Sequence, residues 1–205
     1  DVLIIINEKK KDIKKYFSPD PELEDALLAA GKTTYLQRLK NIYSMANISF
    51  AYQPKPLGSG DAVMRAKSFT GDQPFCLSWG DDLIEANPPV MKQLIGAFEQ
   101  TGCPIVGVQH MDGDDIVKYG VAKVSESSGK LHKLEGIVEK PPINELPSRL
   151  ASLGRYVLTP EIYTALENIT PGLGGELQFT DALKLMCPDV YAYEFDGKRY
   201  DMGDK

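Results

Sequence analysis

Hydrophobic and polar positions along the first part of the chain change repeatedly between strand-like and helix-like spacing. Val2–Ile6 is an uninterrupted aliphatic run, which is typical of a fully buried strand. Apolar side chains at helical spacing predict helices at about residues 10–17, 22–30 and 33–45. Asp20 before Pro21 is a helix start and Gly31 is a helix stop, so the second helix has defined ends.

The same alternation continues to about residue 109. Strand-like runs cover residues 48–53, 74–79 and 105–109, and helix-like runs cover 60–67 and 88–100. Strands that are joined by helices favour a parallel sheet with helices on both faces. The first half therefore predicts an α/β fold with parallel strands.

Beyond Tyr119 the runs become shorter. Strands are predicted at residues 120–124, 131–134, 137–138, 153–158 and 190–195, and helices at 161–167 and 179–186. Residues 127–130 have the composition of a hairpin turn. We therefore expect antiparallel additions to the sheet in the second half.

The composition is that of an acidic globular protein. Lysine and arginine number 23 and aspartate and glutamate 29, which gives a net charge of −6 over 205 residues. Nucleic-acid grooves and anionic membranes require a surplus of basic residues, so neither is expected as a partner. No run approaches the roughly 18 apolar residues of a membrane span. The widely spaced Cys76, Cys103 and Cys187 have apolar neighbours, which predicts buried free thiols in a reducing cytoplasm.

Several common signatures fail on spacing. Gly31-Lys32-Thr33 lacks the earlier glycine of a P-loop, because Ala26 stands there. Gly58-Ser59-Gly60 lacks the third small residue of a dinucleotide fingerprint. A nucleophile elbow is absent, and His110 and His132 have no metal-ligand spacing. Hydrolase triads and zinc sites are therefore not expected.

Polar residues at the ends of predicted strands remain, and open α/β sheets bind ligands there. Gln53 ends one strand and is followed by Gly58 and Gly60. The flat amide of Gln53 is able to read the edge of a base, and glycines let the backbone approach a planar ring. On local features alone, the stretch fits a plain strand-to-helix turn better.

Carboxylates form a second group. Asp81 and Asp82 follow the strand at 74–79 directly, and Asp201 comes near the end of the sequence. Two carboxylates from separate strand ends are able to hold one Mg²⁺ together with phosphate oxygens. Turn formation or helix capping is the alternative for Asp81 and Asp82.

A third group of residues is suited to bind a sugar phosphate. Pro141 ends a strand, so Glu139 and Lys140 are able to sit together at a cleft, where Glu139 accepts from hydroxyls and Lys140 meets a phosphate. An ordinary surface ion pair is the alternative. Gly120 either admits a ligand against the backbone or starts a strand, and the glycine-rich loop with Glu176 is also explained as a helix cap.

Taken together, these stretches resemble the sugar nucleotidyltransferase superfamily, and within it the bacterial UTP:glucose-1-phosphate uridylyltransferase family. The resemblance covers nearly the whole chain and rests on residues 53–62, 81, 118–120, 138–141, 154–156, 174–182 and 199–205. It implies one domain over residues 1–205 with a Rossmann-like nucleotide-diphospho-sugar transferase fold. That fold has a mixed, mainly parallel sheet flanked by helices.

The resemblance also implies a reaction and its ligands. Glucose 1-phosphate would attack the α-phosphorus of UTP, giving UDP-glucose and pyrophosphate, with Mg²⁺ as the cofactor. Such a displacement requires no protein nucleophile, which agrees with the failed motifs. The implied roles are uracil contact for Gln53 and Gly58, glucose contact for Gly120, Glu139 and Glu176, sugar-phosphate contact for Lys140, and metal binding for Asp81 and Asp201. Asp81 and Lys140 are the catalytic candidates.

The chain departs from the family pattern at a few places. The family's first strand and its G-x-x-x-R phosphate loop are missing from the sequence, and its C-terminal end is also expected to be missing. We therefore expect the 205-residue chain alone to be inactive. Tyr52 stands where the family usually has Arg, and Asp61 stands where a His is common.

Two other functions stay open from the sequence. One is thymidylyl transfer to glucose 1-phosphate, and the other is a nucleotide-sugar-binding module without catalysis. Relative rates on UDP-glucose and dTDP-glucose separate the first from the uridylyl reaction. The resemblance further implies a cytoplasmic homo-oligomer.

Overall fold

The computed structural model describes residues 1–172 and 175–202. Its strands are β1 (Val2–Ile6), β2 (Ile48–Tyr52), β3 (Phe75–Ser78), β4 (Asp82–Glu85), β5 (Ile105–His110), β6 (Gly120–Ser128), β7 (Leu131–Glu139), β8 (Leu150–Leu158), β9 (Tyr191–Glu194) and β10 (Lys198–Asp201). Its helices are α1 (Ile13–Tyr16), α2 (Pro21–Ala29), α3 (Thr33–Ser44), α4 (Ser59–Met64), α5 (Lys67–Thr70), α6 (Val90–Thr101), α7 (Glu161–Asn168) and α8 (Phe179–Met186), with short 3-10 turns η1 (Glu8–Lys10), η2 (Asp114–Lys118) and η3 (Ile143–Glu145).

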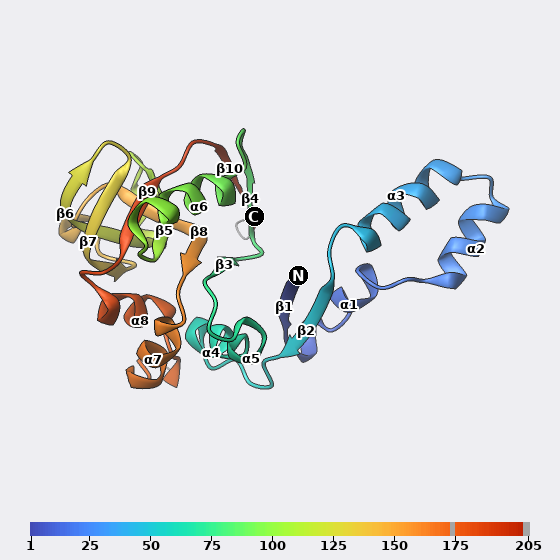
Figure 1. The fold of residues 1–205 in the computed structure, drawn as a ribbon, viewed down its shortest axis with the longest axis horizontal. Coiled ribbons are helices and arrows are strands. Elements are labelled where there is room, and N and C mark those ends of the chain that lie inside the picture. Colours follow the sequence, from blue (N-terminus) through green and yellow to red (C-terminus); the bar gives the residue numbers. More distant parts are fainter. Residues whose placement is uncertain (173–174, 203–205) are drawn as a thin grey trace.

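A six-stranded sheet, in the order β3-β8-β5-β9-β7-β6, forms the core of one half of the molecule (Figure 1). β5 and β9 pair in parallel, whereas β8 runs antiparallel to both β3 and β5. β7 likewise runs antiparallel to its neighbours β9 and β6. The mixed α/β class is confirmed, but the expected predominance of parallel pairs is wrong, because β8 returns between β3 and β5.

Alternation along the strands gives the sheet two apolar faces, and each is covered by helices. Val106, Tyr156 and Leu158 pack with α4, α7 and α8, where Leu166, Phe179 and Leu183 are buried. Ile105, Leu153 and Val157 point the other way and pack with α6, whose Leu94 is fully buried. The predicted placement of helices on both faces is therefore confirmed for this sheet.

The first part of the chain extends away from the six-stranded sheet (Figure 1). β1 and β2 pair in parallel over five residues, and α1 to α3 form the connection between them. Asp20 caps α2 by accepting a hydrogen bond from the backbone N–H of Leu23, and Gly31 turns the chain with φ of 67°. β1 is less buried than predicted: only Ile6 is buried, and Val2 is 43% exposed.

Several element predictions need correction. The helix at 10–17 is instead a 3-10 turn followed by the single helical turn α1, and the helix ending at Lys67 divides into α4 and α5. The two strands at 131–138 are one continuous strand, β7. Cys76 is exposed and the other two cysteines are half-buried, although all three are free thiols.

The turn before α4 is locked against the segment before α8. Leu177 donates its backbone N–H to Leu57 O (2.7 Å) and accepts at its own carbonyl from Gly60 N (2.8 Å). A Cβ on Gly58 would lie 2.4 Å from the Leu177 carbonyl oxygen, and Gly58 also has φ of 101°. Glycine is therefore required there both for the backbone conformation and for the close approach.

This close approach predicts the effect of Gly58→Ala. We expect a loss of about 3 kcal/mol or more in the free energy of unfolding, because a methyl group would collide with fixed backbone. Chemical denaturation measures it. Gly102→Ala is the matched control, since Gly102 also has positive φ but open space around it, and should cost about 1 kcal/mol. Equal losses in both variants would contradict the packing argument.

Candidate active site

A cavity of about 340 Å³ opens beside β3, β6 and β8 and brings together half of the predicted site residues. Asp81, Gly120, Glu139 and Asp201 all line it. They come from the turn after β3, the start of β6, the end of β7 and the end of β10. The other lining residues are Ser59, Trp79, Asp82, Lys118, Tyr119, Ser152, Gly154, Tyr156, Gln178, Phe179, Thr180 and Arg199.

Three aromatic rings in mutual contact form one wall of the cavity. Phe179 packs edge-on against Trp79 (5.6 Å between centroids) and Tyr156 (5.0 Å). The Tyr156 hydroxyl lies 3.0 Å from Ser152 Oγ and accepts a hydrogen bond from Trp79 Nε1 (3.3 Å). Interlocked rings of this kind resist displacement, so the wall has a defined shape.

Another part of the cavity lining is acidic and is organised by one arginine. Arg199 Nε donates to Asp82 Oδ1 (2.5 Å), and its two terminal nitrogens donate to Asp201 Oδ2 (2.8 Å) and the Tyr119 hydroxyl (2.9 Å). Its guanidinium also lies over the Tyr119 ring, 4.6 Å from the centroid. The Tyr119 hydroxyl donates in turn to Asp201 Oδ2 (2.8 Å). We call Arg199, Asp82, Asp201 and Tyr119 the arginine cluster.

The short ladder between β4 and β10 explains how the cluster forms. Asp82 lies directly opposite Asp201 in this antiparallel pair, so both side chains are on the same face. Arg199 is two residues before Asp201 and shares that face. Arg155 holds the backbone around Asp82, since it donates hydrogen bonds to the carbonyl oxygens of Trp79 (3.0 Å) and Asp82.

Charge and burial shift the pKa values in the cluster. Burial raises the pKa of Asp82, and the negative charges of Asp81 and Asp201 act in the same direction, while Arg199 opposes them. Burial alone lowers the pKa of Arg199, but its hydrogen bonds to Tyr119 and Asp82 outweigh this and the net shift is upward. Arg199 therefore stays cationic and offsets the crowding of the carboxylates.

Gly120 and Glu139 lie opposite each other in the β6–β7 ladder. A Cβ on Gly120 would come within 3.2 Å of Glu139 Oε2, so glycine leaves room for that carboxylate. Burial raises the pKa of Glu139, and the charge of Lys140 opposes the shift. Lys140 follows with positive φ of 47°, which costs an L-residue about 1 kcal/mol, and its N–H donates to Tyr119 O (3.1 Å).

The remaining predicted site residues are not among those lining the cavity. Gln53 and Gly58 belong to the neighbouring turn before α4, where the Gln53 amide nitrogen donates to Gly58 O (2.9 Å). Ser59 in this turn does line the cavity, and its hydroxyl accepts from Phe179 N (3.1 Å). Glu176 is exposed and accepts from the Gln178 side chain (3.1 Å). Gly174, Gly203, Asp204 and Lys205 of the motifs in the sequence lie outside the described residues.

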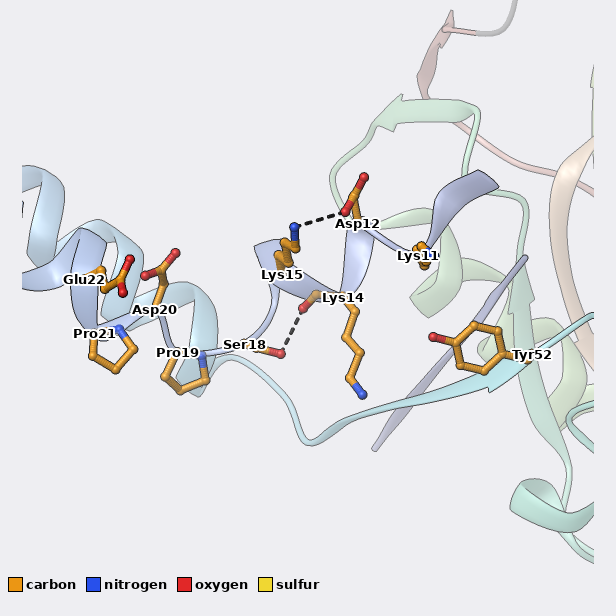
Figure 2. A pocket seen from close by; sticks show the side chains of 10 residues that line it. All are labelled: Lys11, Asp12, Lys14, Lys15, Ser18, Pro19, Asp20, Pro21, Glu22 and Tyr52. Carbon is orange, nitrogen blue, oxygen red and sulfur yellow. Dashed lines mark hydrogen bonds and ion pairs between the residues drawn. The ribbon is translucent and has the colours of Figure 1, made fainter. Parts of the chain in front are cut away.

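A second concavity, of about 770 Å³, lies between α1 and the start of α2 (Figure 2). Lysines and acidic residues line it together with Tyr52, and Lys15 pairs with Asp12 at 3.2 Å. Both partners are more than 70% exposed, so this ion pair contributes little. None of the predicted site residues lines it, and we assign it no function.

The cavity beside β3 suits a hard cation that also binds phosphate. Among the described residues no group of three or more His, Cys, Asp or Glu side chains is arranged to enclose a metal ion. Mg²⁺ commonly uses one or two carboxylates plus water and phosphate oxygens, and Asp81 and Asp201 supply such a pair at one cavity. The donor set therefore fits Mg²⁺ held jointly with a phosphorylated ligand.

The sequence did not single out Arg199, Tyr119 or Asp82 for the roles that they have here. Arg199 and Asp201 are two residues apart, which on a strand places them on one face. The strand that contains them, β10, was not predicted from the sequence. The aromatic wall was missed as well, because Trp79, Tyr156 and Phe179 are ordinary apolar positions in their own elements.

The chain belongs to the nucleotidyl transferase family, whose model matches residues 3–205. Within that family it is 41% identical to the UTP–glucose-1-phosphate uridylyltransferase of Bacillus subtilis (strain 168). That similarity covers 100% of this chain and 71% of the relative. A second such enzyme, from Staphylococcus saprophyticus, is 40% identical over 100% of this chain and 72% of its own length.

Solved structures agree. A crystal structure of apo UDP-glucose pyrophosphorylase has a TM-score of 0.89 and 32% identity, covering 98% of this chain and 76% of that chain. A UTP-bound UGPase from Acinetobacter baumannii has a TM-score of 0.87 and 32% identity, and the match covers 99% of this chain and 73% of that chain. A Bacillus anthracis structure assigned as a glucose-1-phosphate thymidylyltransferase is 20% identical with a TM-score of 0.71, which is a likeness of fold alone.

Removing the cation of the arginine cluster should destabilise the fold. We expect Arg199→Met to lower the free energy of unfolding by about 2 kcal/mol, because Asp82 and Asp201 lose their common partner. Denaturant titration measures the change. Lys123→Met is the control: Lys123 pairs with Glu135 at the surface, and its loss should cost under about 1 kcal/mol. Comparable costs for the two variants would refute this role of Arg199.

Proposed function

We propose that this protein transfers a uridylyl group from UTP to glucose 1-phosphate, forming UDP-glucose and pyrophosphate. The observation that carries the proposal is the 40–41% identity to UTP–glucose-1-phosphate uridylyltransferases across 100% of the chain. The cavity supports it, since the carboxylates of Asp81, Asp201 and Glu139 converge there with Gly120. The thymidylyl alternative rests on a similarity of fold alone.

Each group has a proposed task in this reaction. Asp81 and Asp201 would hold Mg²⁺, which supplies charge neutralisation on phosphate oxygens when it is bound. Glu139 accepts hydrogen bonds from glucose hydroxyls, with Gly120 leaving space beside it, and Lys140 holds the sugar phosphate. The protein itself orients two anions for an in-line displacement and provides no nucleophile.

In this proposal, two neighbouring segments of the chain bind the uracil and the outer part of the sugar. Gln53 and Gly58 contact the base from the turn before α4, next to Ser59 of the cavity. Glu176 approaches the sugar from the loop before α8. The backbone hydrogen bonds between Leu57, Gly60 and Leu177 support this division, because they hold the two segments side by side.

The setting of the reaction is part of the same proposal. Three free thiols agree with a cytoplasmic location. Homo-oligomeric assembly is supported by the exposed apolar side chains of α2 and α3, among them Leu28 (59% exposed) and Tyr35 (62%). No helix within residues 1–172 and 175–202 is long and apolar enough to cross a membrane.

The reverse reaction is the direct test. The complete product of the gene that encodes this chain should consume UDP-glucose in the presence of Mg²⁺ and pyrophosphate, and should do so faster than it consumes dTDP-glucose. Faster loss of dTDP-glucose would establish the thymidylyl reaction instead. Binding of UDP-glucose without any turnover would favour the non-catalytic module.

The metal assignment predicts the behaviour of Asp81→Asn and Asp201→Asn. Either variant should lose Mg²⁺-dependent turnover by at least about a hundredfold, since one charged ligand is removed. Asp81→Asn is the cleaner variant, because Asp201 also accepts hydrogen bonds from Arg199 and Tyr119 and its change affects folding too. Thermal unfolding serves as the control, and wild-type rates in Asp81→Asn would exclude this residue as a ligand.

Lys140→Ala tests the phosphate contact. We expect the KM for glucose 1-phosphate to rise about tenfold or more while the KM for UTP stays within about twofold, because in this proposal the ammonium group binds the sugar phosphate and not the nucleotide. Initial-rate kinetics at saturating second substrate separate the two constants. An equal rise in both would assign Lys140 to the fold or to the nucleotide.

A further inference from the structure

The side chain of Asp61 makes two contacts that the proposed reaction does not use. The residue is only 6% exposed and lies on α4. One carboxylate oxygen accepts from Arg65 (2.5 Å), and the other accepts from the amide nitrogen of Gln53 (3.0 Å). A buried carboxylate that bridges a cation and a proposed base contact has a defined orientation.

These contacts determine which end of the Gln53 amide faces inward. Gln53 Nε2 lies between Asp61 Oδ2 (3.0 Å) and Gly58 O (2.9 Å). A carboxylate and a carbonyl oxygen only accept hydrogen bonds, so both neighbours require the NH₂ group. A rotated amide would place its oxygen against two other oxygens. The amide oxygen of Gln53 is therefore directed away from α4 as a fixed acceptor.

We propose that Asp61 is a positioning residue for base selection: it holds Gln53 so that only an acceptor is presented to the pyrimidine. This rests on the proposed function, in which Gln53 contacts the base. Uracil and thymine carry an N3–H that donates to such an acceptor, whereas cytosine has a bare lone pair at N3. An acceptor that faces a lone pair is repelled and left without a partner, which disfavours cytosine nucleotides.

The same geometry defines what Asp61 does not select. The 5-methyl group of thymine lies away from N3, so Asp61 is indifferent to the choice between UTP and dTTP. It also acts only through Gln53 and touches no reacting atom, so its substitution should change nucleotide binding much more than the rate at saturation.

Asp61→Asn tests the proposal with little change in volume. One acceptor becomes an NH₂ group, so Gly58 O alone still favours the NH₂ end of Gln53, and the amide turns more readily to donate to cytosine N3. We measure the Kd of UTP, CTP and dTTP by calorimetry in the complete product of the gene that encodes this chain, together with kcat. We expect the UTP preference over CTP to fall at least about tenfold, the ratio of UTP to dTTP to stay within about twofold, and kcat at saturating UTP to change less than about twofold.

Arg65→Met is the matched control, because it removes the partner of the other carboxylate oxygen and leaves the bond to Gln53 in place. Its UTP preference over CTP should stay within about twofold of the parent. If Arg65→Met loses the preference to the same extent, Asp61 acts only by stabilising α4 and the proposal is overturned. Asp61→Ser, whose shorter side chain withdraws the acceptor, replaces Asp61→Asn if thermal unfolding shows that the latter does not fold.

The outcomes separate this proposal from the function on which it rests. Turnover of UDP-glucose with an unchanged UTP preference in Asp61→Asn overturns the role of Asp61 and leaves the function standing. A parent protein without turnover, whose UTP preference disappears in Asp61→Asn, supports Asp61 and overturns catalysis. A parent that binds UTP no better than CTP overturns the base contact itself.

Discussion

The neutralisation of clustered carboxylates by Arg199 is the interaction on which the candidate site depends. Asp82 and Asp201 face each other across the β4–β10 ladder, and Asp81 lies in the adjoining turn. Without a cation among them, these like charges would repel one another at close range. Arg199 binds two of these carboxylates and Tyr119 at once. It therefore joins the β4–β10 pair to the residue that precedes β6 in the six-stranded sheet.

This arrangement assigns different tasks to the cation and to the anions. The arginine cluster fixes carboxylate oxygens at the cavity by contacts within the chain. The aromatic wall of Trp79, Tyr156 and Phe179 is fixed by ring packing and by hydrogen bonds of the Tyr156 hydroxyl. A site whose lining is held in these two ways loses little conformational entropy when two anionic substrates bind.

The sequence predicted what is local and missed what depends on distant pairing. Helix α8 and the Asp20 cap of α2 were found because periodicity and capping are properties of neighbouring residues. The family resemblance implied that Gly120 and Glu139 contact the same sugar, and they meet because a hairpin joins their strands. By contrast, β4 and β10 are four residues each and pair across more than one hundred positions, so no local pattern marked them. The insertion of β8 between β3 and β5 had no local signal either, and Arg199 was missed for the same reason.

Contact between the turn before α4 and the segment before α8 has a mechanical consequence. Leu177 is hydrogen-bonded through its N–H to Leu57 and through its carbonyl to Gly60, and Phe179, two residues later, belongs to the aromatic wall. The segment that would carry the base and the segment beside the sugar thus share one rigid frame. Thermal displacement of either segment carries the other with it, so the spacing between the two substrate halves is preserved while their absolute position fluctuates.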